Sequence, residues 1–165
     1  SSFELLEAGV AVAMHGRPRE YKKKLQDPAA QAGYKKKVDA IRNGTALILS
    51  CRKARRYDAA AMDASAKLLQ VVPEIYTIWN FRREALDPVF VAGGDAAVTA
   101  SDGELSLTSA CLLENPKSYS AWHHRKWVVA KGLCDLHSEM RLVARALSAD
   151  GRNFHAWNYR QFVAR

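Results

Sequence analysis

The side chains best suited to acid–base or metal chemistry in this sequence are five histidines: His15, His123, His124, His137 and His155. His123 and His124 are adjacent on a predicted helix, so their side chains diverge by about 100° and cannot bind one metal ion together. No two histidines have the His-x-x-x-His spacing of a helical zinc site. The histidine spacing therefore argues against a zinc site built within this chain.

Other chemistries find equally little support in the sequence. Three cysteines, Cys51, Cys111 and Cys134, are widely spaced and form no Cys-x-x-Cys pair, which indicates reduced thiols in a cytoplasmic protein. There is no glycine-rich phosphate loop and no serine nucleophile elbow. Taken without any resemblance, the residues predict only a protein that binds another protein.

The strongest pattern is an internal repeat. Three segments read aromatic-x-x-Trp-[Asn/His]-x-Arg, and a leucine ten residues before each tryptophan extends the match. The aligned residues are Trp79, Trp122 and Trp157, followed by Arg82, Arg125 and Arg160. An aromatic residue three positions before each tryptophan shares its helix face, so we expect all three indoles in the core between repeats. Each arginine should stack on an aromatic ring of a neighbouring hairpin or pair with an acid.

The tryptophans are 43 and 35 residues apart, and this period predicts helical hairpins stacked as a solenoid. We therefore expect an all-α fold, a right-handed alpha-alpha superhelix. The eight extra residues are assigned to a loop over 87–103, which contains Pro88 and Gly93-Gly94. Asn115 and Asp150 are expected to cap the helices that follow them. The expected helices span about 30–54, 58–71, 74–86, 104–114, 117–131, 137–149 and 153–164.

The net charge of +8 comes from one segment, because residues 17–56 alone carry +10. Residues 1–28 are predicted to be an irregular basic segment, and residues 29–165 a repeat domain with repeats near 58–86, 104–131 and 137–165. The lysine runs at 22–24 and 35–37 fit a solvated helix surface or a docking surface for an acidic partner. Basic residues are not interleaved with aromatics as in nucleic-acid binders, and no apolar run is long enough to span a membrane.

These repeats resemble those of protein prenyltransferase alpha subunits, which read Pro-x-x-Tyr-x-x-Trp-x-x-Arg-Arg, and the resemblance covers residues 58–165. Residues 115–127 (NPKSYSAWHHRKW), residues 152–162 (RNFHAWNYRQF) and the start Met14-His15-Gly16-Arg17 are most similar to the type II enzymes, the Rab geranylgeranyltransferases. The resemblance implies a cytoplasmic heterodimer whose beta subunit holds zinc and the prenyl diphosphate. It implies transfer of geranylgeranyl from geranylgeranyl diphosphate to C-terminal cysteines of Rab GTPases, with the Rab escort protein as a further partner.

The resemblance also assigns site residues. Lys117 falls on the family's lysine near the diphosphate, Tyr119 on a tyrosine that hydrogen-bonds nearby, and His155 on a histidine one repeat later. His15 would contact the partner's zinc only if processing exposed it at the terminus. The first repeat departs from the family pattern, with Val72 in place of asparagine and Glu74 where the second repeat has Lys117.

Alternatives remain open at this point. The chain could be the alpha subunit shared by farnesyltransferase and type I geranylgeranyltransferase, or a non-catalytic adaptor like a tetratricopeptide protein. Family alpha subunits have more than three hairpins, so we expect a fragment of a longer solenoid, or a partner that covers its end.

Overall fold

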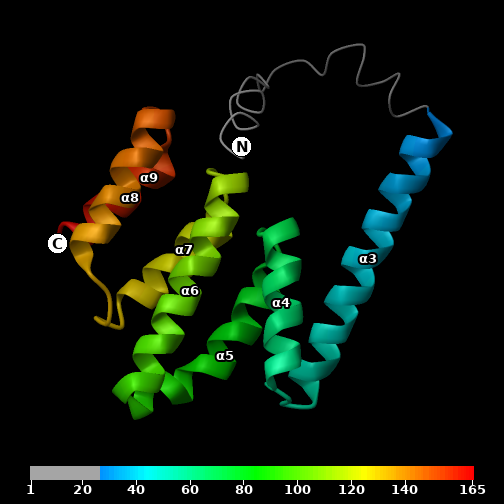
Figure 1. Cartoon of the computed structure of the whole chain (residues 1–165), viewed down its shortest axis with the longest axis horizontal. Helices are drawn as coiled ribbons and strands as arrows, with labels where there is room; N and C mark the ends of the chain where they lie inside the picture. Colours follow the sequence, from blue (N-terminus) through cyan, green and yellow to red (C-terminus); the bar gives the residue numbers. More distant parts are fainter. Residues whose placement is uncertain (1–26) are drawn as a thin grey trace. The chain divides into compact units, whose positions relative to one another are not determined.

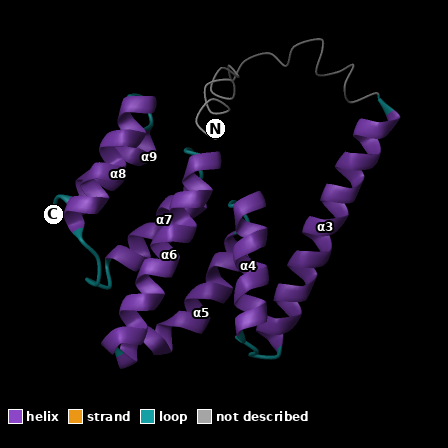
Figure 2. Ribbon diagram, viewed as in Figure 1, coloured by secondary structure: helices purple, strands orange, loops and turns teal. Residues whose placement is uncertain are grey.

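The computed structural model describes residues 27–165, which form seven α-helices and no strand (Figures 1 and 2). The expected all-α class is confirmed. The expectations for the segment before residue 27, including His15, lie outside the described residues. The helices are α3 (Pro28–Lys53), α4 (Ala59–Val71), α5 (Tyr76–Ala92), α6 (Gly94–Glu114), α7 (Tyr119–Val129), α8 (Leu136–Ala149) and α9 (Phe154–Val163).

The chain divides into two units, Ser1–Ala40 and Ile41–Arg165. The described part of the first unit is the N-terminal part of α3, where Lys35, Lys36 and Lys37 are all exposed. The second unit contains the rest of α3 and all of the helical repeats.

Three helical hairpins make up most of the second unit: α4–α5, α6–α7 and α8–α9. Short turns at 72–75, 115–118 and 150–153 connect the two helices of each pair. Corresponding helices of successive hairpins pack on one another, α4 on α6, α5 on α7 and α7 on α9 (Figure 1). The stacking expected from the tryptophan period is therefore present.

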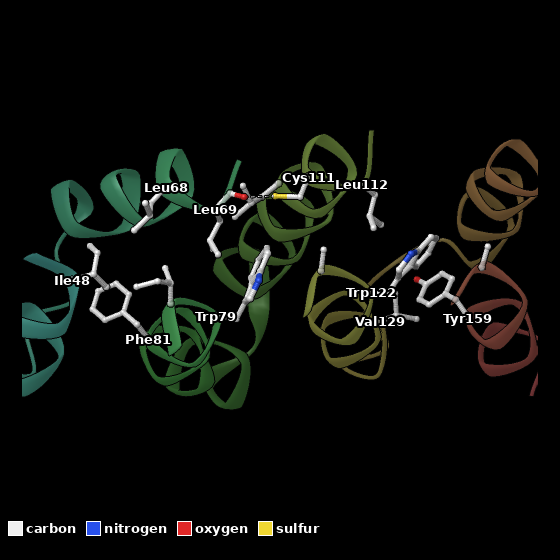
Figure 3. Close-up of a cluster of buried hydrophobic side chains, with 14 of the residues drawn as sticks. Ile48, Leu68, Leu69, Trp79, Phe81, Cys111, Leu112, Trp122, Val129 and Tyr159 are labelled. Atoms are coloured by element: carbon white, nitrogen blue, oxygen red, sulfur yellow. Dashed lines mark hydrogen bonds between the residues drawn. The ribbon is translucent and has the colours of Figure 1, made fainter. Parts of the chain in front are cut away.

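The core runs through the seams between these hairpins (Figure 3). Trp79 is fully buried and Trp122 is 3% exposed, each packed against a ring from the next hairpin. Trp157 is 46% exposed, so its expected burial is wrong. The reason is geometric: the ring that covers each of the other two indoles comes from the following hairpin, and no described helix follows α9.

The expected loop over 87–103 is also wrong. Helix α5 continues through Pro88 to Ala92, and α6 begins two residues later at Gly94. Gly93 makes the bend between them with φ 72°, a backbone conformation that glycine adopts without a steric penalty. The additional residues lengthen two helices, to 17 and 21 residues, where α7 and α8 have 11 and 14. Proline in a helix removes one backbone hydrogen bond, a local loss that the long helix tolerates here.

The starts of the second helices differ from expectation by one or two residues, and in α7 and α9 the capping side chain is not the expected one. Ser118 caps α7 by accepting from the Ala121 N–H, and Asn153 caps α9 by accepting from the N–H groups that follow it. Asn115 and Asp150 instead end the preceding helices, α6 and α8. The two residues expected to cap the second helices therefore lie at the start of the turns that precede those helices.

Candidate functional site

Each repeat tryptophan fixes the turn that precedes its own helix. The indole N–H donates to the carbonyl six residues earlier in all three repeats: Trp79 to Pro73 at 2.8 Å, Trp122 to Pro116 at 2.9 Å and Trp157 to Gly151 at 2.8 Å. A buried indole N–H needs such a partner. The bond ties the turns, which carry the candidate site residues, to the helices behind them.

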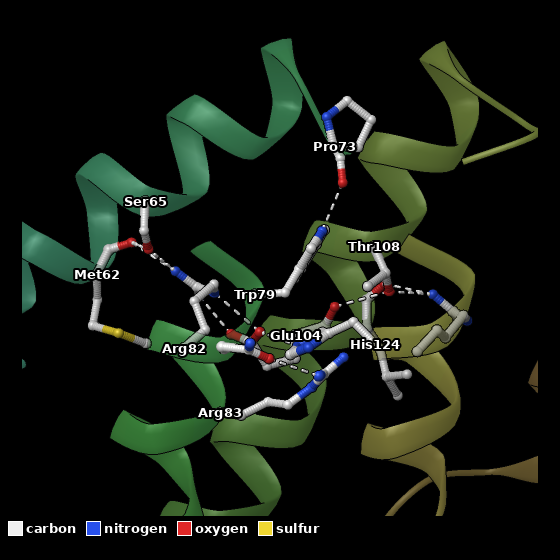
Figure 4. A network of polar contacts seen from close by, with 12 residues as sticks. Met62, Ser65, Pro73, Trp79, Arg82, Arg83, Glu104, Thr108 and His124 are labelled. Carbon is white, nitrogen blue, oxygen red and sulfur yellow. Dashed lines mark hydrogen bonds and ion pairs between the residues drawn. The ribbon is translucent and has the colours of Figure 1, made fainter. Parts of the chain in front are cut away.

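Two of the three repeat arginines, Arg82 and Arg125, each join three helices. The Arg82 Nε donates to Glu104 on α6 at 3.0 Å, and its Nη1 donates back to Met62 O and Ser65 Oγ on α4 at 2.7 and 2.6 Å (Figure 4). Of the two expected roles for this side chain, pairing with an acid is therefore the one observed.

Arg125 repeats this arrangement one hairpin later. It pairs with Glu139 on α8 at 2.7 Å and donates to the Leu105 carbonyl and the Thr108 hydroxyl on α6, both at 2.8 Å. The carbonyl and hydroxyl acceptors lie 20 and 17 residues before the arginine in both cases. Arg160 is exposed and lies over the Trp157 ring at 5.6 Å instead, and the residue 17 positions before it is Val143, which offers no hydroxyl.

The buried glutamates receive a second donor from the residue two positions after each tryptophan. His124 Nε2 lies 2.8 Å from Glu104, and Tyr159 OH donates to Glu139 at 2.5 Å. In both pairs the glutamate lies 20 residues earlier in the chain. The first repeat has Phe81 at that position and Ala61 20 residues before it, an apolar pair in the same place.

Electrostatics at Glu104 favour a charged acid beside a neutral imidazole. Burial raises the pKa of Glu104, but its hydrogen bonds with His124 and Arg82 outweigh burial and the pKa lies below its ordinary value. Burial lowers the pKa of His124, with Glu104 opposing. The imidazole, which lies between the rings of Trp79 and Trp127, is thus a structural donor and not an accessible base.

In contrast, the residues assigned by resemblance gather at an exposed seam between the second and third hairpins. The rings of Tyr119 and His155 meet edge to face with centroids 5.5 Å apart, and Tyr119 is 67% exposed. Lys117 lies in the turn just before α7, and its Nζ is 3.1 Å from Asp150 Oδ2. Three expected site residues from two hairpins are therefore brought to one surface.

The charge around His155 is predominantly positive. Partial burial lowers its pKa; Glu74 opposes this, and the charges of Lys117 and Lys126 lower it further. His155 therefore remains neutral at physiological pH and can donate or accept one hydrogen bond. Lysine and tyrosine beside it supply an ammonium group and a hydroxyl, the donor types that stabilise a phosphate leaving group.

More cations continue this surface onto the first hairpin. His123 packs on the ring of Tyr76 with centroids 6.1 Å apart, and its pKa is lowered by burial and by the charges of Arg83 and Lys126. Arg83 lies over the same tyrosine ring at 5.3 Å. Neither Arg83 nor Lys126 was predicted as a site residue, although each directly follows a repeat arginine and occupies the last position of the Pro-x-x-Tyr-x-x-Trp-x-x-Arg-Arg pattern.

Comparison with known proteins bears directly on these repeats. The model of the protein prenyltransferase alpha subunit repeat matches residues 101–132 and 136–165, which contain most of the second hairpin and all of the third. Both segments are therefore similar to protein prenyltransferase alpha subunit repeats. The resemblance drawn from the tryptophan motif is thus confirmed.

Several known proteins are similar over most of this chain. The mouse geranylgeranyl transferase type-2 subunit alpha is 34% identical over 153 residues, which cover 92% of this chain and 27% of that protein. The Arabidopsis thaliana geranylgeranyl transferase type-2 subunit alpha 2 is 35% identical, over 91% of this chain and 23% of that protein. The Dictyostelium discoideum geranylgeranyl transferase type-2 subunit alpha is 31% identical, over 91% of this chain and 50% of that protein. The chain therefore spans about a quarter to a half of these relatives.

The residues from 27 onward contain no metal-binding cluster: no three histidine, cysteine or acidic side chains are placed to hold an ion there. The thiols offer little reactivity, since burial raises the pKa of Cys111 to about 11 and also raises that of Cys134. None of the described helices has the length and apolar character needed to cross a membrane.

Proposed function

We propose that this chain is part of the alpha subunit of a type II protein geranylgeranyltransferase, and that the seam of its second and third hairpins faces the prenyl diphosphate bound by a beta subunit. The observation that carries the proposal is the convergence of Lys117, Tyr119 and His155 on one exposed surface, within the two hairpins that match the family.

The chemistry of the surface suits a departing diphosphate. Transfer of a prenyl group to a cysteine thiolate forms a carbon–sulfur bond and breaks the bond between C1 and the diphosphate oxygen. Negative charge grows on that oxygen as the bond breaks. Lys117 would place an ammonium group there, while the Tyr119 hydroxyl and the neutral His155 would donate hydrogen bonds.

The remaining components would come from partners. Zinc would be held by the beta subunit, where it would lower the pKa of the substrate cysteine. The acceptor would be a Rab GTPase presented by its escort protein in the cytoplasm. The names of the relatives support this class over the farnesyltransferase and type I alternative.

The test is co-expression of the chain with type II and farnesyltransferase beta subunits. We expect a stable complex with the type II beta subunit that transfers geranylgeranyl to a Rab protein ending in two cysteines, and not to a CaaX peptide. Transfer to the CaaX peptide would favour the farnesyltransferase and type I alternative. Failure to form a complex with either beta subunit would favour a non-catalytic adaptor.

A further inference from the structure

Asp150 holds its carboxylate in a fixed place at the end of α8. Its backbone N–H donates to Ala146 O at 3.0 Å, and its Oδ1 accepts from the Arg152 N–H at 3.0 Å. The carboxylate is therefore positioned by the backbone of the third hairpin. Its other oxygen, Oδ2, faces Lys117 on the second hairpin at 3.1 Å.

The same turn also holds the backbone beside Lys117. Asn153, which is 1% exposed, donates from Nδ2 to Pro116 O at 2.9 Å while its Oδ1 caps α9. Thus the third hairpin fixes the backbone immediately before Lys117 through one side chain and the ammonium group of Lys117 through another.

The ion pair is specific to this seam. At the seam between the first and second hairpins the corresponding residues are Glu74 and Asn115, which cannot form an ion pair, and Glu74 accepts from Ser120 Oγ at 3.3 Å instead. The side chain of Lys117 is 50% exposed and that of Asp150 36%. Such an exposed pair adds little to stability, so its effect is on the position of the ammonium group.

We propose that Asp150 is a positioning residue for Lys117: it holds the ammonium group beside Tyr119 and His155, already in the position from which it contacts the diphosphate. This inference rests on the proposed function. An ammonium group has three N–H donors, so one can remain on Asp150 while the others reach phosphate oxygens. The pKa of Asp150 fits the pairing, because the Arg152 N–H and then Lys117 lower it.

The experiment is a double-mutant cycle in the assembled heterodimer, measured as the single-turnover rate of geranylgeranyl transfer. Asp150→Asn keeps an oxygen for the Arg152 N–H and removes the charge. We expect it to slow transfer about tenfold with little change in KM, because misplacing a catalytic group costs up to about 10²-fold. In a Lys117→Ala background the same change should cost nothing further. Asp63→Asn, which breaks the exposed pair with Lys67 on α4, is the matched control and should leave the rate unchanged.

A second measurement checks the pair in this chain alone. Carboxyl NMR titration should show the pKa of Asp150 rising in Lys117→Ala; an unchanged pKa would overturn the inference. If Lys117→Ala slows transfer while Asp150→Asn does not, or if the two losses multiply, the positioning role is wrong and the proposed function stands. If Lys117→Ala itself leaves the rate unchanged, the assigned site and this inference both fail.

Discussion

At the scale of single residues, the repeats depend on buried charges whose hydrogen bonds are satisfied from three helices. Glu104 is 2% exposed and receives Arg82 from the hairpin before and His124 from its own hairpin. Glu139 receives Arg125 and Tyr159 in the same way. A buried charge is tolerated when it is paired in this manner, and removal of one partner leaves the other uncompensated.

Replacing Glu104 with glutamine should therefore be severely destabilising. Removing one member of a buried ion pair costs about 3–5 kcal/mol, and we expect that loss in the free energy of unfolding by urea denaturation. The matched control is Glu84→Gln, because Glu84 pairs with Arg52 at the surface with its side chain 39% exposed. An exposed ion pair contributes about 0–1 kcal/mol. Equal losses in the two variants would therefore contradict the stabilising role given to the buried Glu104 ion pair.

The buried histidine predicts a pH dependence of stability. In the unfolded chain His124 titrates near pH 6.5, whereas burial lowers its pKa in the folded protein. Below pH 6.5 the unfolded chain therefore binds more protons, and stability falls as the pH drops toward the folded pKa. Glu104 affects stability at lower pH. Its pKa in the folded protein lies below 4.5, so its contribution to stability is present above pH 4.5 and is lost as the pH falls through the folded pKa.

His124→Gln keeps an N–H donor for Glu104 and removes the titration. The slope of unfolding free energy against pH below 6.5 should become shallower in this variant, although His123 and His155, whose pKa values are also lowered, keep part of it. A slope identical to that of the wild-type chain would show that His124 is not buried as a neutral ring.

At the scale of helices, the sequence predicted the repeat well and the connections poorly. The tryptophan register identified three hairpins because indole burial and its hydrogen bond recur at fixed spacing. Pro88 and Gly93-Gly94 suggested one long loop, but a proline costs a helix only locally, and the two glycines, with φ 72° and 70°, are enough for the bend. The buried glutamates were not predicted, because hydrophobic periodicity identifies only apolar core residues. Their constant spacing of 20 residues before His124 and Tyr159 was the one sequence signal that could have indicated them.

Two glycines test the observed helices directly. Gly103 lies inside α6 with open space where a Cβ would be, so Gly103→Ala should stabilise the protein by about 0.5–1 kcal/mol. Gly93 has φ 72°, and Gly93→Ala should destabilise it by about 1–3 kcal/mol. Thermal unfolding of both variants provides the comparison. Effects near zero for both would instead fit a flexible loop over 87–103.

At the scale of the whole molecule, the three tryptophans are equivalent in sequence and unequal in environment. Trp79→Ala should cost about 3–5 kcal/mol of unfolding free energy because the indole is fully buried. Trp157→Ala should cost clearly less in this chain, because the ring is 46% exposed. Chemical denaturation of the two variants tests this, and similar losses would mean that Trp157 is covered in solution.

The candidate site also depends on how the hairpins of this chain stack. Lys117, Tyr119 and His155 could be given site roles from sequence only through the family resemblance, since Lys117 belongs to no pattern of its own, Tyr119 fills the aromatic position common to all three repeats, and His155 is one of five histidines. Their meeting on one surface requires the second and third hairpins to stack in register, which the arginine and tryptophan contacts described above secure.

The most direct test of the account is the single-turnover rate of geranylgeranyl transfer by the heterodimer, compared between the wild-type chain, Lys117→Ala and the control Lys67→Ala. Loss of one donor to developing charge costs about 2.7–4 kcal/mol, so we predict that Lys117→Ala slows transfer about 10²–10³-fold while assembly and thermal stability are unchanged. A Lys117→Ala heterodimer that transfers at the wild-type rate would contradict the placement of this surface at the diphosphate.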